Sequence, residues 1–424
     1  MRHVPILLAA ALVLAGTASA VPGAKQSKLL RLQKIAHVHP EGYSGDVFGH
    51  LGYAYLSSWH GPQCDAVGVR VFDVRTPSKP QRVSTFADEQ SQPKVHGTWT
   101  EKTIAQHVAT DDFSGELAVV SFQSCGGKNF QGFGLYDVTN PARPRELSLV
   151  ELTPRGSHEI WLQAKGNSAY VYTAIPRSEL ISAPDYDFQT QRATKPGEPD
   201  FRIFDVSDPT HPVQVGEWGA WKQLGIKPWE GRGRFPANFV HSVITNPSAT
   251  RAYLSYWDLG TVILDIGDPS HPRYLGRTPA SDLEGDAHSA ALTKNGKVLI
   301  ETHETSNGYP TLFDISKPTK PKKLSNFRLP GVATADNFTS GVHDPKILGN
   351  RAYFSWYSRG VVVADITNPR KPKRLAQFLP PKTADAGAAL CQSACGLVWG
   401  VYATKNYVLA SDMLSGLWIL KLRS

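Results

Sequence analysis

The sequence predicts an all-β protein built as a seven-bladed β-propeller. One motif, an apolar run followed by Asp-Ile or Asp-Val and then Pro-x-x-Pro, returns along the chain at intervals of about 50–70 residues, which is a repeat length typical of propellers. The chain also contains 36 Gly and 31 Pro. Between the motifs lie short alternating or β-branched runs bounded by Gly, Asn and Pro, which are typical of strands and turns.

The repeated motif marks the turn after the third strand of each repeat. The first copy reads Val-Arg-Val-Phe-Asp-Val-Arg-Thr-Pro-Ser-Lys-Pro at 69–80. An Asp can accept a hydrogen bond from the backbone two residues further on, and the prolines fix φ in the turn. We therefore expect the aspartates to shape turns and give them no catalytic role. They are Asp73, Asp137, Asp205, Asp265, Asp314 and Asp365.

Each repeat is expected to form one four-stranded blade. In the sixth repeat the strands are predicted at 342–348, 352–357, 360–366 and 374–378, with the turn Gly349-Asn350 between the first two. The seven innermost strands are expected near 46–49 and at 104–109, 158–164, 240–245, 288–293, 342–348 and 398–403.

The two ends of the chain are expected to share one blade. Segment 29–38 has the pattern of a fourth strand, whereas the last repeat, which ends in a degenerate motif copy, supplies only three strands before Ser424. Pairing 29–38 with 416–422 closes the circle and protects the sheet edges. The prediction is a single domain over 21–424, closed by pairing of the N-terminal strand with the C-terminal blade.

These units resemble the LVIVD repeat, which is found in an exported β-propeller family of bacteria and archaea. The resemblance is carried by 342–344 (Val-His-Asp), 351–354 (Arg-Ala-Tyr-Phe) and 360–372, with weaker copies elsewhere. It covers essentially the whole mature chain and implies the propeller fold. It implies little about activity, because the function of the family is mostly undefined and propellers host many chemistries.

The first twenty residues have the pattern of a signal peptide. Arg2 is followed by an apolar stretch at 6–14 and by the small residues Ala18-Ser19-Ala20, a typical cleavage site. No later apolar run is long enough to span a membrane. We predict an exported, soluble, monomeric protein of the periplasm or the extracellular space.

Four cysteines in an exported chain favour disulfides over thiol chemistry. Cys64 and Cys125 occupy equivalent loops of the first two repeats, so they are placed to bridge neighbouring units, and Cys391 and Cys395 lie close together in one loop. The formal net charge of +8 suits an anionic partner. The basic residues are spread through turns without interleaved aromatics, however, so we expect a solvated basic surface and no nucleic-acid partner.

Loop lengths indicate which face of the disc carries a site. The links between first and second strands are short turns, and those between third and fourth strands are the proline turns; both lie on one face. The links from one blade to the next are long, and so are some second-to-third links, notably 176–200. These lie on the opposite face, called here the long-loop face. Because insertions in repeats usually mark the binding face, we expect a ligand site there.

Five histidines are expected at the mouth of the central channel on the long-loop face. Imidazole suits zinc, copper, iron and nickel, and the acidic neighbours Glu159, Asp286 and Asp344 can orient ligands or bind a ligand themselves. One interpretation is a divalent transition-metal site, and the other is a structural hydrogen bond repeated between blades. The five histidines are His107, His158, His241, His288 and His343.

A second candidate group lies in the loop 221–235, where Trp229 and Arg232 offer aromatic and cationic groups that suit a sugar, a peptide or an acidic ligand. The alternative is that this loop only packs over the disc. The sequence favours a binding or interaction module whose protein, carbohydrate or small-molecule ligand lies on the long-loop face over the channel. The alternative function is a metal-dependent extracytoplasmic hydrolase or oxidoreductase that uses the channel-mouth histidines.

Overall fold

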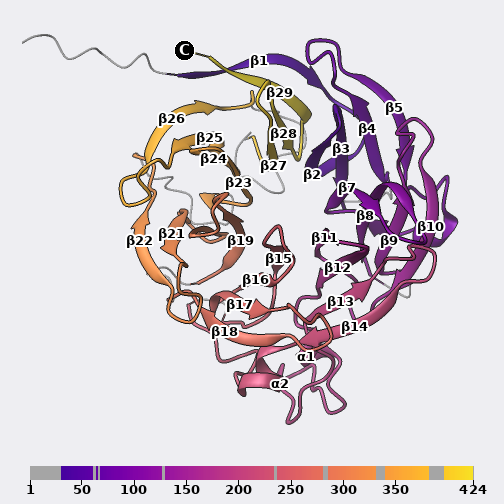
Figure 1. The fold of residues 1–424 in the computed structure, drawn as a ribbon, viewed down its shortest axis with the longest axis vertical. Coiled ribbons are helices and arrows are strands. Elements are labelled where there is room, and N and C mark those ends of the chain that lie inside the picture. The colour runs from indigo at the N-terminus through magenta and orange to yellow at the C-terminus, as the bar shows by residue number, and fades with distance from the viewer. Residues whose placement is uncertain are drawn as a thin grey trace, which may run out of the picture.

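Seven antiparallel sheets surround a central axis in the computed structural model (Figure 1). Each sheet has its first strand at the axis and its fourth at the rim, as predicted. The chain ends also meet as predicted, because the N-terminal strand pairs with the C-terminal one from Arg31–Arg423 to Val38–Leu417. The described residues are 30–60, 64, 67–126, 129–233, 236–279, 285–330, 340–381 and 396–423. The predicted signal peptide at 1–20, Cys391 and Cys395 lie outside them.

The first three blades run in sequence around the axis. Blade 1 consists of β2 (Tyr43–His50), β3 (Tyr53–Trp59), β4 (Val69–Asp73) and β5 (Gln81–Phe86). Blade 2 consists of β7 (Thr103–Ala109), β8 (Ser114–Ser124), β9 (Gly132–Asp137) and β10 (Arg145–Glu151), with the additional short strand β6 (Thr98–Trp99) paired to β8. Blade 3 consists of β11 (Glu159–Lys165), β12 (Ser168–Ala174), β13 (Phe201–Asp205) and β14 (Val213–Trp218).

The remaining four blades complete the disc. Blade 4 consists of β15 (Ser242–Thr245), β16 (Arg251–Tyr256), β17 (Gly260–Asp265) and β18 (Arg273–Arg277). Blade 5 consists of β19 (Ala287–Leu292), β20 (Val298–His303), β21 (Thr311–Asp314) and β22 (Lys322–Asn326). Blade 6 consists of β23 (Pro345–Leu348), β24 (Arg351–Trp356), β25 (Gly360–Asp365) and β26 (Lys373–Phe378). Blade 7 consists of β27 (Val398–Ala403), β28 (Val408–Asp412), β29 (Gly416–Arg423) and β1 (Arg31–Val38).

Helical segments occur only in the links of the described chain. They are the 3-10 turn η1 (Pro93–Val95), α1 (Ser178–Ile181) in the 176–200 link and α2 (Ala220–Leu224) before blade 4. Figure 1 shows α1 and α2 together at one edge of the disc, beyond β14. None of the described helices is long and apolar enough to cross a membrane.

The blades are held together by apolar packing between sheets and by one repeated contact at the rim. Between blades 3 and 4, for example, Ile203 packs in one buried cluster with Leu254 and Val262, which removes apolar surface from water. At the rim, Gly216 lies so close to the carbonyl oxygen of Pro269 that a Cβ would stand 2.0 Å from it. In three other blades this position is a serine that donates a hydrogen bond to the next proline turn at 2.6–2.7 Å, from Ser84, Ser148 and Ser325.

Candidate functional site at the channel mouth

Each blade contributes two successive residues where its chain enters the channel from the long-loop face. Their equivalence follows from a repeated contact: the N–H of Asp344 donates to Ser355 Oγ at 2.9 Å, and the N–H of Lys102 donates to Ser121 Oγ at 3.0 Å. The upper row comprises Gly45, Glu101, His158, His241, His288, His343 and Trp399. The lower row comprises Asp46, Lys102, Glu159, Ser242, Ser289, Asp344 and Gly400.

Four of the predicted histidines lie side by side in the upper row. The ring centroids of His158 and His241 are 4.3 Å apart, those of His241 and His288 4.0 Å, and those of His288 and His343 4.1 Å. The ring of Trp399 follows His343 at 4.3 Å. The links between blades therefore bring residues from five successive repeats into one continuous row.

His107 does not belong to this row, which corrects its expected place at the channel mouth. It is exposed near the far end of β7, and its Nδ1 lies 2.8 Å from Glu116 Oε1, whose other oxygen contacts His50 Nε2 at 2.6 Å. The equivalent residue in blade 2 is Glu101. The added strand β6 changes how the chain of this blade enters the channel. The repeat position is therefore occupied by Glu101, and His107, the nearest histidine in the sequence, lies elsewhere.

His288 is oriented so that one ring nitrogen keeps a free lone pair. Its Nδ1 lies 2.8 Å from the carbonyl oxygen of His343. A carbonyl oxygen only accepts, so Nδ1 carries the proton and Nε2 keeps the lone pair. This Nε2 lies 3.5 Å from Glu304 Oε2, while the hydroxyl of Tyr357 donates to Glu304 Oε1. Both side chains are thus fixed by partners on their far sides, which is the usual arrangement around metal ligands.

His241, His288 and Glu304 form the one group of three or more His, Cys, Asp or Glu within the described residues whose ligand atoms suit a metal ion. One ligand atom from each lies within 4.8 Å of the other two. Two imidazoles and one carboxylate are a donor set used for zinc and for non-haem iron(II). Sequence reasoning missed Glu304, which directly follows β20, because nothing in the repeat motif marks that position.

The upper row differs in charge along its length. His158 Nδ1 lies 2.7 Å from Glu101 Oε2. Burial alone would lower the pKa of His158, but the carboxylate of Glu101 raises it overall. Burial lowers the pKa of His241, His288 and His343 well below its usual value, and nearby cationic groups add to this effect. These three rings are therefore neutral at pH 7, which is the form that coordinates a metal.

Several buried polar atoms of the row have no hydrogen-bond partner among the described residues. They include Nδ1 of His241 and both ring nitrogens of His343, although Glu101 Oε1 lies 3.9 Å from His343 Nε2. Buried polar atoms without a partner are unfavourable, and a bound ion or ligand is one way to satisfy them. The row also contains a hydrogen bond between blades, because His158 Nε2 lies 2.8 Å from His241 Nε2. It thus combines contacts between blades with nitrogens that a ligand could satisfy.

Below the histidines, one lysine closes the channel. Lys102 Nζ lies 2.6 Å from Glu159, 3.4 Å from Asp46 and 3.4 Å from Asp344. Because Asp344 belongs to blade 6 and Lys102 to blade 2, the side chain spans the axis. Burial opposes the charge of Lys102, but the three carboxylates raise its pKa well above the usual value. Glu159 and Asp344, two of the predicted ligand-binding residues, are thus committed to an internal ion cluster.

Trp229 lies away from the channel, in the loop after α2. Its ring meets that of Trp221 at 5.2 Å between centroids, and the guanidinium of Arg192 lies 4.9 Å from its centroid. These contacts join the loop to the 176–200 link.

Arg232 and Asp286 are joined through the carboxylate of Asp258. Their backbone N–H groups meet the two carboxylate oxygens of Asp258, at 2.9 Å and 3.4 Å respectively. The carbonyl oxygen of Asp286 accepts from the N–H of Glu304 at 3.0 Å. Asp286 therefore helps to place Glu304, the carboxylate of the candidate metal group.

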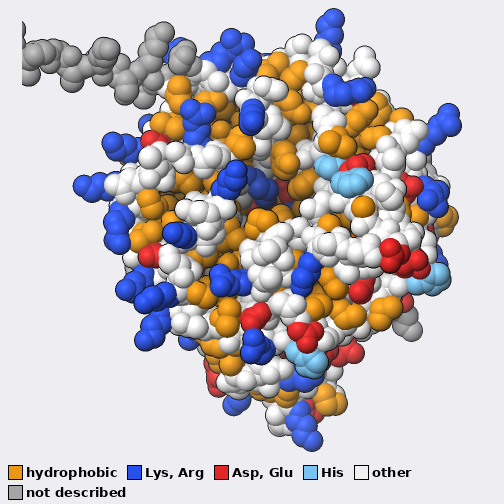
Figure 2. Space-filling view, viewed as in Figure 1, with side chains coloured by type: hydrophobic (Ala, Val, Ile, Leu, Met, Phe, Trp, Pro, Cys, Tyr) orange, Lys and Arg blue, Asp and Glu red, His pale blue; other side chains and the backbone are white. Residues whose placement is uncertain are grey.

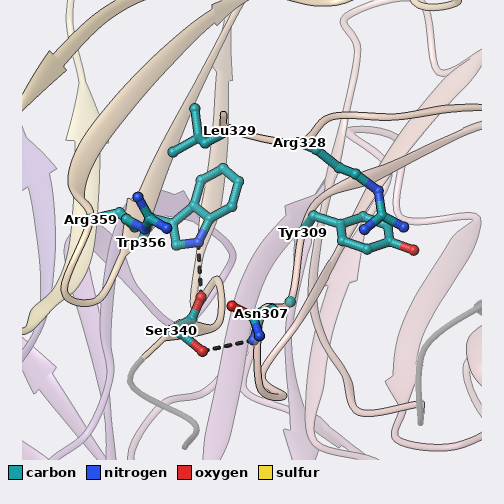
Figure 3. A pocket seen from close by; sticks show the side chains of 8 residues that line it. Asn307, Tyr309, Arg328, Leu329, Ser340, Trp356 and Arg359 are labelled. Carbon is teal, nitrogen blue, oxygen red and sulfur yellow. Dashed lines mark hydrogen bonds between the residues drawn. The ribbon is translucent and has the colours of Figure 1, made fainter. Parts of the chain in front are cut away.

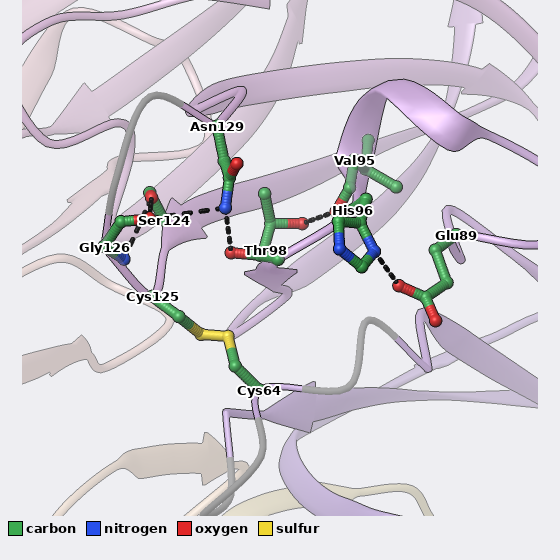
Figure 4. Close-up of a disulfide and its surroundings, with 10 residues drawn as sticks. Cys64, Glu89, Val95, His96, Thr98, Ser124, Cys125, Gly126 and Asn129 are labelled. Carbon is green, nitrogen blue, oxygen red and sulfur yellow. Dashed lines mark hydrogen bonds and ion pairs between the residues drawn. A yellow bond between two sulfur atoms is a disulfide. The ribbon is translucent and has the colours of Figure 1, made fainter.

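The predicted pairing of Cys64 with Cys125 is confirmed (Figure 4), with their Cα atoms 6.1 Å apart. The N–H of Cys125 donates to the carbonyl oxygen of Gly97 at 3.0 Å, next to β6. The chain then leads from β6 into Glu101 and Lys102, so the disulfide supports the segment that supplies blade 2's residues to the channel. Disulfides are typical of oxidising compartments.

Together these features define a class: a seven-bladed β-propeller with histidines gathered at one mouth and a lysine closing the channel beneath them. The family model for the LVIVD repeat matches residues 197–218 and 251–278, in blades 3 and 4. The chain therefore contains LVIVD repeats within a seven-bladed propeller, as the resemblance led us to expect.

Solved structures show the same fold at low sequence identity. Raptor from Chaetomium thermophilum is similar with a TM-score of 0.60 and 12% identity, over 94% of this chain and 30% of that one. The computationally designed Ika8 protein is similar with a TM-score of 0.51 and 9% identity, over 92% of this chain and 99% of that one. A comparison with curated proteins finds no match.

Proposed function

We propose that this protein is an exported binding module that holds a divalent transition-metal ion at the channel mouth and binds its ligand through that ion. The observation that carries the proposal is the convergence of His241, His288 and Glu304, whose ligand atoms lie within 4.8 Å of one another. Three protein ligands leave coordination positions open, as in metal sites that accept an external group. The signal-peptide pattern and the Cys64–Cys125 disulfide support export.

The ligand is expected to approach from the long-loop face. On the other side of the histidines, Lys102 and its carboxylates span the channel. Within the metal group the side chain of Glu304 is 16% exposed, against 1% for His288, so access is on the Glu304 side. The ligand is then a small molecule, or an end group of a carbohydrate or protein, that offers an oxygen or nitrogen to the metal.

A second candidate function is a metal-dependent hydrolase or oxidoreductase at the same site. The open coordination positions favour it, because catalytic zinc sites combine three protein ligands with a position for water or substrate. Turnover of a substrate by the metal-loaded protein would distinguish it from the binding module.

The metal site is tested by elemental analysis and by cobalt(II) and zinc(II) titration of protein purified without chelators. His288→Ala and Glu304→Gln are compared with His107→Ala, a matched histidine variant outside the row. We expect about one metal per chain in the wild type and in His107→Ala, and an affinity loss of about tenfold or more in the other two. An absence of binding in the wild type, or an equal loss in His107→Ala, would overturn the proposal. Thermal unfolding checks that each variant is folded.

A further inference from the structure

The positive charge of this protein is concentrated on one sector of the disc. Segments 314–328 and 359–374, in blades 5 and 6, contain ten Lys or Arg and two Asp, a net of +8. This equals the formal net charge of the whole chain, so the rest of the chain is neutral overall. In the proline turns and outer strands of blades 2 and 3, at 137–151 and 205–218, two basic residues stand against six acidic ones.

The two basic segments form one continuous strip at the rim. Ser325 of blade 5 donates to the carbonyl oxygen of Pro369 in the turn of blade 6 at 2.7 Å. Hydrogen bonds from Ser316 lower the pKa of Asp314, and Lys322 and Arg370, one from each blade, lower it further. Figure 2 shows basic side chains gathered along the left side of the view, where Figure 1 places β22 and β26. The charge is therefore less evenly spread than the sequence alone predicts.

On the long-loop face the strip leads to a cavity of about 80 Å³ (Figure 3). Arg374 donates to Gln377 at 3.1 Å, and Gln377 donates to the carbonyl oxygen of Arg359 at 2.8 Å. Arg359 lines the cavity, and Arg328 lines it from the other blade. Two guanidinium groups beside a small cavity suit a carboxylate or sulfate group.

The wall of this cavity is preorganised. The guanidinium carbon of Arg328 lies 3.7 Å from the centroid of the Tyr309 ring, a cation–π contact that holds an exposed arginine in place. Ser340 accepts from the N–H of Asn307 at 2.7 Å through its hydroxyl, and from Trp356 Nε1 at 3.1 Å through its carbonyl. The cavity therefore keeps its shape, and Figure 3 shows the guanidinium of Arg328 over the Tyr309 ring at one side of it.

We propose that the strip binds an acidic polysaccharide, whose successive anionic groups lie along the rim of blades 5 and 6 and one of which enters the cavity. None of the large apolar side chains that are exposed in the described chain lies in the two segments. The strip thus lacks the apolar centre of a protein–protein interface and the aromatic platforms that bind single-stranded nucleic acid. A polymer with regularly spaced anionic groups and little apolar surface fits both the strip and the cavity.

The test measures binding of the full chain to polygalacturonate, with neutral dextran as the ligand control, by isothermal titration calorimetry. The variant Lys371→Glu/Lys373→Glu reverses two charges of the strip. Its matched control, Arg143→Glu/Arg145→Glu, reverses two basic charges at the same positions of the blade 2 turn. At low salt we expect binding to polygalacturonate only, weakened about tenfold in the strip variant and by less than about twofold in the control.

Further arms separate this surface from the metal site and identify the anion. Removing metal with EDTA should leave the polysaccharide affinity unchanged, whereas Arg328→Ala should reduce it. An absence of binding, or equal losses in the two charge-reversal variants, would overturn the proposal. Tighter binding of poly-L-glutamate or of anionic phospholipid vesicles than of polygalacturonate would overturn the assignment to a polysaccharide.

Discussion

Two positions of the same repeat have opposite roles in this propeller. At the rim, the turn aspartate is the same in six blades and does the same work: Asp365 Oδ1 accepts from the N–H of Thr367 at 2.8 Å, and Asp205 Oδ1 from the N–H of Ser207 at 2.8 Å. At the axis, the entry positions hold acidic, basic, imidazole and indole side chains in different blades. A propeller can thus repeat its scaffold at the rim and vary its chemistry at the axis, where equivalent positions meet.

The charged pairs at the rim and at the axis also differ in how far they are exposed to water. At the rim, Arg273 pairs with Asp265, and their side chains are 75% and 30% exposed. Such pairs contribute little, because water and salt screen them. At the axis, Lys102 and Glu159 are 7% and 2% exposed. Removal of one buried partner leaves the others without compensation, so substitutions should have much larger effects at the axis than at the rim.

The largest effect is expected for Lys102→Met, which leaves three buried carboxylates without their shared cation. We expect the free energy of unfolding to fall by about 3–5 kcal/mol, measured by urea denaturation at pH 7. The comparison variant is Lys346→Met, which removes a more exposed partner of Asp344 alone and should cost clearly less. Equal losses in the two variants would mean that the cluster does not depend on the central lysine.

A second prediction concerns pH and separates axis from rim by the sign of the pKa shift. Burial raises the pKa of Glu159 to about 7, against the opposing effect of Lys102. Between pH 4.5 and pH 7, the folded protein therefore holds a proton on Glu159 that the unfolded chain has released. Because of this group, the free energy of unfolding falls as the pH rises from about 4.5 to about 7, and above pH 7 the group has no further effect. Glu159→Gln should remove the contribution of this group to the slope, which for a pKa raised from 4.5 to about 7 amounts to about 3 kcal/mol.

The rim control for that experiment is Asp365→Asn. Hydrogen bonds from Thr367 lower the pKa of Asp365, so its contribution is complete above the unfolded pKa of about 4 and is lost only as the pH falls further. The unfolding free energy of this variant, measured by denaturant titration at pH 5, 6, 7 and 8, should keep the wild-type slope. If Glu159→Gln also keeps that slope, the buried carboxylate does not retain its proton in the folded state.

The same contrast explains what could be predicted from the sequence. Turn chemistry is local, so the Asp and proline pattern was enough to place the blades and the closure of the two chain ends. His158, His241, His288 and His343 could be placed because each stands next to the start of its inner strand. Their shared position then followed from the repeat itself.

Other residues of the site could not be found in this way, because they depend on contacts between distant segments. Glu101 and Lys102 reach the channel through the irregular entry of blade 2, where β6 and the Cys64–Cys125 disulfide change the path of the chain. Glu304 follows the second strand of blade 5 and meets His288 across the β19–β20 hairpin, at a position that the repeat motif does not mark. His241 joins them from blade 4. Likewise, the basic strip is visible only when blades 5 and 6 lie side by side.

The smallest effect is expected for Asp365→Ala at the rim. The change removes the acceptor for the N–H and the hydroxyl of Thr367, at 2.8 Å and 2.6 Å, in a turn that water can reach. We expect a loss of about 0.5–1 kcal/mol in the free energy of unfolding and no change in metal affinity, measured by urea denaturation and by cobalt(II) titration. Asp205→Ala, the equivalent change in blade 3, should behave alike. A loss as large as that of Lys102→Met would contradict the view that the rim repeats a weak, local contact while the axis holds the interactions on which stability depends.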